Sequence, residues 1–104
     1  MKQVTGTFLN PLGDPAAGAT VNFVLSTPEN TSYGTVVRER VQVVLDVNGS
    51  FSIELYGNDE FQTAGSFYNI TLVDPVYGRI LYENVAIVGE SPINLNGLVP
   101  IFVK

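Results

Sequence analysis

Two neighbouring carboxylates, Asp59 and Glu60, are the side chains best placed for acid–base chemistry, and Asn58 precedes them. A catalytic pair of this kind needs a pocket and a partner with a shifted pKa. The same residues also suit the start of a short helical turn, where an Asn side chain caps free N–H groups and acids lie in the first turn. We therefore predict an Asn58-capped turn over residues 59–61 and assign no catalytic residue there.

The segment DVNGS at residues 46–50 has the composition of the start of a calcium loop. It lacks the later bidentate Glu at the required spacing. Asn48-Gly49 between Leu45 and Phe51 is instead a strong hairpin signal, because a type I′ turn needs positive φ at both central residues and these two tolerate it best. We predict such a hairpin turn here and no metal site.

Histidine and cysteine are both absent. Ser-His and Cys-His nucleophile pairs therefore cannot form within this chain, and neither can the usual zinc and non-haem iron ligand sets. No nucleophile, base and orienting group can be assembled from the motifs present. We expect no enzyme, no catalytic or cofactor-binding residue, and no cofactor.

Length and composition favour one soluble domain over residues 1–104. The chain is 45% apolar and 14% charged, which argues against disorder, and its net charge of −5 is spread without an acidic run. The five basic residues do not cluster, so we expect no nucleic-acid partner. We also expect no membrane insertion, because no apolar run is long enough to cross a bilayer.

Alternating apolar residues between Gly, Pro, Asn and Asp clusters predict strands throughout, over residues 2–9, 19–27, 35–47, 50–56, 66–74, 79–88, 93–95 and 98–103. The fold class is therefore all-β, an antiparallel immunoglobulin- or transthyretin-like β-sandwich of about seven strands. Residues 74–78 read as a second hairpin connection. Residues 10–18 and 27–34 form the longer loops, and the second is the one we expect to be mobile.

The period of two assigns the core. The inward set comprises Val21, Phe23, Leu25, Val41, Val43, Leu45, Val47, Phe51, Ile53, Leu55, Tyr68, Ile70 and Leu72. Tyr68 follows the predicted turn, as does the Tyr of a tyrosine corner, whose hydroxyl bonds back to upstream backbone. Residues 79–88 carry apolar side chains on both faces, which indicates either burial against a partner or a central strand.

Two stretches carry a family resemblance. VTGTFLNPLGDPAAGATVNFVL is similar to the start of carboxypeptidase regulatory-like and transthyretin-like modules. LDVNGSFSIELYGNDE, followed by AGSFYNITLVDPVYGRILYENVAIVGESPINLNGLVP, resembles β-sandwich domains of tail-fibre and related structural proteins of tailed bacteriophages. The chain departs from that pattern before Gly89, where Val85, Ala86 and Ile87 stand in place of the usual Trp.

This resemblance implies a non-enzymatic virion structural or assembly protein, made in the host cytoplasm, that resembles a tail-fibre or baseplate-associated module and docks to identical copies or to other virion proteins. Fibre proteins commonly trimerise, so a homo-oligomer of three copies is expected. The expected interface comprises Ile80, Tyr82, Val88, Leu98 and Ile101. The alternative is a module that binds a carbohydrate or a host receptor, with Asn30 and Tyr33 as its ligand-loop residues.

Overall fold

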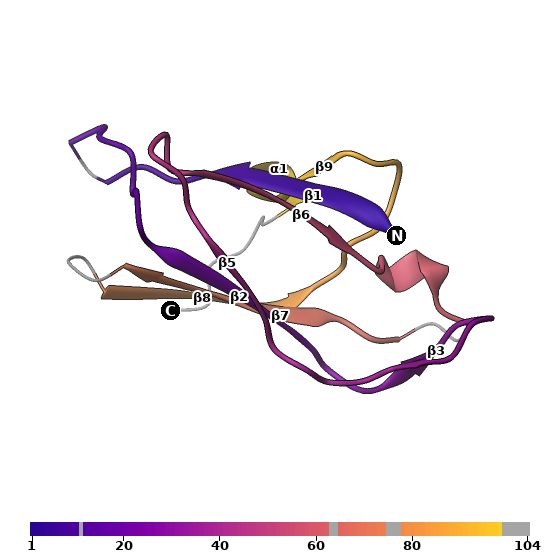
Figure 1. Cartoon of the computed structure of the whole chain (residues 1–104). Helices are drawn as coiled ribbons and strands as arrows, with labels where there is room; N and C mark the ends of the chain where they lie inside the picture. Colours follow the sequence, from indigo (N-terminus) through magenta and orange to yellow (C-terminus); the bar gives the residue numbers. More distant parts are fainter. Residues whose placement is uncertain (11, 63–64, 75–77, 99–104) are drawn as a thin grey trace.

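The computed structural model describes residues 1–10, 12–62, 65–74 and 78–98, and it is a β-sandwich (Figure 1). Strands account for 48% of the chain, in two stacked and largely antiparallel sheets, so the predicted fold class is confirmed. The first sheet has the order β6-β1-β9, formed by Ser50–Leu55, Lys2–Thr7 and Ile93–Asn94. The second has the order β5-β2-β7-β8, formed by Val41–Val44, Thr20–Leu25, Tyr68–Asp74 and Gly78–Val85. A hairpin of β3 (Glu29–Asn30) and β4 (Thr35–Val36) adds a small third sheet.

The core lies between the two sheets and follows the predicted alternation. On β2, Val21, Phe23 and Leu25 are buried while the residues between them are partly exposed. Phe23 packs against Phe51 of β6, with ring centroids 5.9 Å apart, and thereby joins the two layers. Burial of these apolar faces is the main favourable term in the stability of such a sandwich.

The turn at residues 46–49 is present, but it is not the predicted type I′ hairpin. Gly49 alone has positive φ, at 73°, and Asp46 organises the turn by accepting the N–H groups of Asn48 and Ser50 on its Oδ1. The flanking strands also belong to different sheets, since β5 pairs with β2 and β6 pairs with β1. The turn therefore carries the chain from one layer to the other.

The single strand predicted over residues 35–47 is wrong. β4 ends at Val36 and β5 begins at Val41, and Arg38, Glu39 and Arg40 lie between them. Three consecutive charged residues cannot alternate into an apolar core, so the ladder breaks there. Val47, expected in the core, is 81% exposed because it occupies the turn.

A bulge in β8 explains why residues 79–88 carry apolar side chains on both faces of the predicted strand. Tyr68 pairs with Val85 and Ile70 with Tyr82, so β8 holds one more residue than β7 across this interval. Asn84 supplies the bulge, with φ at 56°. The bulge reverses the alternation, which buries both Tyr82 and Val85. Among the described strands, β8 lies at the end of its sheet's order, so these strands give no support to the central-strand interpretation.

The last described segment departs from the predicted pair of strands. β9 pairs in parallel with β1, and α1 (Leu95–Leu98) follows it at once. Leu98 therefore ends a short helix, while residues 99–103 lie outside the described residues. Among the described residues, no helix is long and apolar enough to cross a membrane.

Candidate functional site

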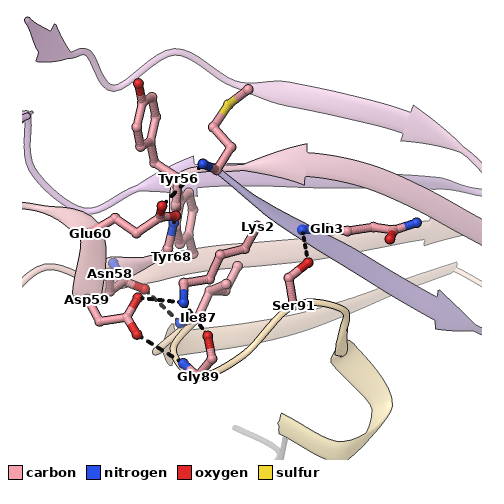
Figure 2. Close-up of polar contacts among 12 residues, drawn as sticks. Lys2, Gln3, Tyr56, Asn58, Asp59, Glu60, Tyr68, Ile87, Gly89 and Ser91 are labelled. Carbon is pink, nitrogen blue, oxygen red and sulfur yellow. Dashed lines mark hydrogen bonds and ion pairs between the residues drawn. The ribbon is translucent and has the colours of Figure 1, made fainter. Parts of the chain in front are cut away.

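Asn58 is a structural bridge and not the predicted helix cap. The turn η1 (Asn58–Glu60) is capped by Gly57, whose N–H donates to the Glu60 carboxylate at 2.7 Å. The buried Asn58 side chain accepts the Ile87 N–H at 2.7 Å (Figure 2). It also donates to the Ser66 hydroxyl at 3.1 Å. Its backbone N–H also donates to the Ile87 carbonyl at 2.7 Å. The residue thus ties η1 to the segment after β8.

Asp59 joins the first strand to the segment before β9. Its Oδ2 accepts the Gly89 N–H at 3.0 Å, and its Oδ1 lies 3.2 Å from the Lys2 ammonium, which also donates to the Gly89 carbonyl (Figure 2). The hydrogen bond from Gly89 has the largest effect and lowers the pKa of Asp59; burial opposes it, and Lys2 lowers the pKa further. Asp59 is therefore held ionised as a structural group.

Tyr68 forms the predicted tyrosine corner. Its hydroxyl donates to the Tyr56 carbonyl at 2.7 Å, twelve residues upstream (Figure 2). Burial, and to a lesser extent the charge of Glu60, raises the pKa of Tyr68 to about 12. The corner fixes the end of β6 against the start of β7, across the two sheets.

Replacing Tyr68 with Phe is expected to destabilise the protein by roughly 1–3 kcal/mol, because the Tyr56 carbonyl loses its partner in a partly buried site. Denaturant unfolding of Tyr68→Phe beside the parent measures this. Equal unfolding free energies would contradict the corner's stabilising role.

The pH dependence gives the same substitution a second readout. In the unfolded chain Tyr68 ionises near pH 10.0, whereas the folded chain retains the proton to about pH 12. The protonated Tyr68 hydroxyl therefore contributes its full stabilisation of the folded state below pH 10, and this stabilisation is lost between about pH 10 and pH 12. Tyr68→Phe should lose less stability over that interval than the parent does.

An apolar groove opens along the side of the sandwich where the edge strands β5 and β6 face each other. Its volume is about 370 Å³. The lining combines β-strand ends with the link between β4 and β5, and comprises Met1, Leu25, Thr35, Val36, Val37, Glu39, Val41, Glu54, Leu55, Tyr56 and Tyr68. We call this feature the edge groove.

Two carboxylates border the edge groove without compensation. Glu39 comes from the link before β5 and Glu54 from β6, and both are exposed. The ion pairs among the described residues join Met1 to Glu60 and Lys2 to Asp59, so neither groove carboxylate has a cationic partner there. Met1 also lines the groove, but its ammonium is paired with Glu60, so the groove is apolar within and carries two carboxylates without an ion pair at its edge.

The two ligand-loop candidates lie together on the β3–β4 hairpin. Asn30 ends β3, and its side-chain oxygen accepts the Thr35 hydroxyl at 2.7 Å. Tyr33 is at the tip and is 92% exposed. A small hollow of about 160 Å³, lined by Thr31, Tyr33, Gly34, Thr35, Val36 and Tyr56, shares residues 35, 36 and 56 with the edge groove. The predicted loop 27–34 thus contains a strand and adjoins the groove.

The described residues place only part of the predicted interface. Tyr82 is buried in the core, so its side chain is not available to a partner. Val88 is 42% exposed just beyond β8. Ile80 lies on β8 and Leu98 ends α1, whereas Ile101 lies outside the described residues. Tyr82 faces inward because it pairs with Ile70 of β7, which is itself buried in the core.

Sequence reasoning missed the edge groove because its lining comes from elements far apart in the chain. The one available signal was the charged run of residues 38–40, which interrupts an otherwise apolar strand pattern. In the part of the chain that the structure describes, no three His, Cys, Asp or Glu side chains gather as metal ligands do. No protein-family model matches this chain, and a search of curated proteins gives no significant match.

Proposed function

We propose that this chain is a non-enzymatic structural or assembly module of a virion, of the tail-fibre or baseplate-associated kind. It works by docking to identical copies or to other virion proteins through strand edges and apolar surface. The proposal combines the resemblance of the sequence to tail-fibre domains with the exposed edges of the sandwich.

The edge position of β8 carries the proposal. This strand of eight residues pairs with β7, and no other described strand pairs with it. An edge of this length offers a row of N–H and C=O groups to another chain. Leu81 on β8 is 38% exposed, and the exposed Val88 lies close by in sequence. Apolar side chains beside an open edge suit association between copies.

One observation favours the carbohydrate-binding alternative. The ring of Tyr33 stands almost fully in solvent, beside a hollow that also contains hydroxyl groups of Thr31 and Thr35. An exposed aromatic ring can stack on a sugar ring, and the Thr35 hydroxyl, whose proton is donated to Asn30, can accept a hydrogen bond from a sugar hydroxyl. This alternative requires binding by a monomer and loss of binding in Tyr33→Ala.

Solution mass separates the two functions. Light scattering at high micromolar concentration should show an oligomer of the parent, with three copies expected. Leu81→Glu should lower that mass, because it places a charge beside the open edge of β8. Val47→Glu is the control, since Val47 is exposed in the turn at residues 46–49.

A strictly monomeric parent would contradict self-docking, and an oligomer that survives Leu81→Glu would show that this edge is not the contact. Substitution of Tyr82 would not test the interface, because a charge at that buried position acts on folding.

A further inference from the structure

We infer that the edge groove binds an extended, largely apolar segment of a partner protein, and that this segment carries a Lys or Arg between Glu39 and Glu54. The inference rests on the docking role proposed above but uses the other edge of the four-stranded sheet. β5 and β8 are the two ends of that sheet's strand order.

The strand edges beside the groove suit an extended segment. β5 pairs only with β2 among the described strands, and β6 pairs only with β1. Each therefore has a free edge where the groove opens, and an incoming extended segment can bond its main chain to such an edge. Successive side chains of a strand point to opposite sides, so alternate ones enter the groove.

The interior of the groove selects apolar side chains. Leu25, Leu55 and Tyr68 are buried core residues that reach its lining, while Val41 is partly buried against the core. The Tyr68 hydroxyl is already bonded to the Tyr56 carbonyl. The interior thus offers packing contacts, and a strongly polar segment would lose its water there without compensation.

The charge at the groove selects a cation. Glu39 and Glu54 have no ion pair among the described residues. The nearby Arg38 donates its Nε–H to the Leu25 carbonyl at 3.0 Å and forms no ion pair with either carboxylate. The whole chain carries a net charge of −5, which adds to the local attraction. A Lys or Arg of the partner segment supplies the cation that Glu39 and Glu54 lack.

Two labelled peptides test the inference by fluorescence anisotropy. The first is acetyl-SVTVKVTS-amide, and the second has Glu in place of its Lys. The parent should bind the Lys peptide about tenfold more tightly, because the swap replaces attraction by repulsion at an exposed pair of carboxylates. This preference should weaken as salt is added.

Matched variants locate the site. Glu39→Gln with Glu54→Gln should abolish the preference for Lys, while Glu83→Gln with Glu90→Gln should keep it after the same change in net charge. Val37→Asn should weaken binding of the Lys peptide, since Val37 lines the groove and is 59% exposed. Val44→Asn is its control, because Val44 is 58% exposed on β5 and does not line the groove.

Four results would overturn the inference or its claim of a bound cation. A Lys preference that persists in the Glu39→Gln, Glu54→Gln variant would place the cation elsewhere. Equal binding of the two peptides, lost only in Val37→Asn, would refute the cation while leaving groove docking intact. No binding of either peptide, or displacement of the Lys peptide by maltotriose, would refute a protein segment as the occupant. None of these results bears on self-association at β8, which solution mass measures.

Discussion

Gly49→Val is expected to destabilise the protein by about 4 kcal/mol or to prevent folding. Gly49 has φ at 73°, a conformation that a β-branched residue strongly disfavours. An added Cβ would also lie 2.4 Å from the Phe8 carbonyl oxygen and 3.0 Å from the Ala16 nitrogen. Both neighbours are backbone atoms, and the Phe8 N–H donates to the Gly49 carbonyl. Denaturant unfolding monitored by circular dichroism measures the loss.

Gly13→Val is the matched control for Gly49→Val. Gly13 also has positive φ, at 89°, but an added Cβ there meets nothing within 4 Å. This variant should lose only the conformational part of the free energy, about 1–2 kcal/mol. If the two variants lose equal stability, the close approach of Gly49 to the backbone of residues 8 and 16 contributes nothing.

Asn58→Ala should cost about 3 kcal/mol of unfolding free energy. The substitution leaves the buried Ile87 N–H without its acceptor and the buried Ser66 hydroxyl without its donor. A buried donor without a partner carries its full desolvation penalty. The same denaturant experiment applies, and amide exchange at Ile87 should quicken because its N–H is no longer protected.

Asn96→Ala provides the comparison for Asn58→Ala. Its side-chain oxygen also accepts a backbone N–H, that of Thr7 at 2.8 Å, but this bond is exposed. Water can replace the lost acceptor there, so the expected cost is below about 1 kcal/mol. Equal costs at positions 58 and 96 would show that burial of Asn58 does not set its contribution.

Local patterns in the sequence were sufficient to predict the sandwich and much of its core. The alternation of Val21, Phe23 and Leu25 identified β2 because its period of two places them on one face. The corner at Tyr68 was equally predictable, since it depends on a residue type shortly after a turn. The position of the turn at residues 46–49 was also predictable, because such a turn needs a residue with positive φ and Gly49 tolerates it.

Pairing between distant segments was decided only in three dimensions. The sequence could not show that β5 and β6 belong to different layers, because a short turn suits a hairpin and a crossing between sheets equally well. Tyr82 was misplaced because the inserted residue at Asn84 brings Val85 and Ile87 to the same buried side as Tyr82, whereas an unbroken alternation puts them on the opposite face. A bulge has no period that sequence can reveal.

The edge groove lies beyond sequence reasoning for the same reason. Its carboxylates, Glu39 and Glu54, come from segments with different roles, and neither has a motif around it. The order of residue types along the chain determined where strands, turns and the apolar interior form, because these depend on the geometry of residues close together in the sequence. The stacking of the two sheets determined which edges stay open and which charges border the groove, because those depend on contacts between residues far apart in the chain.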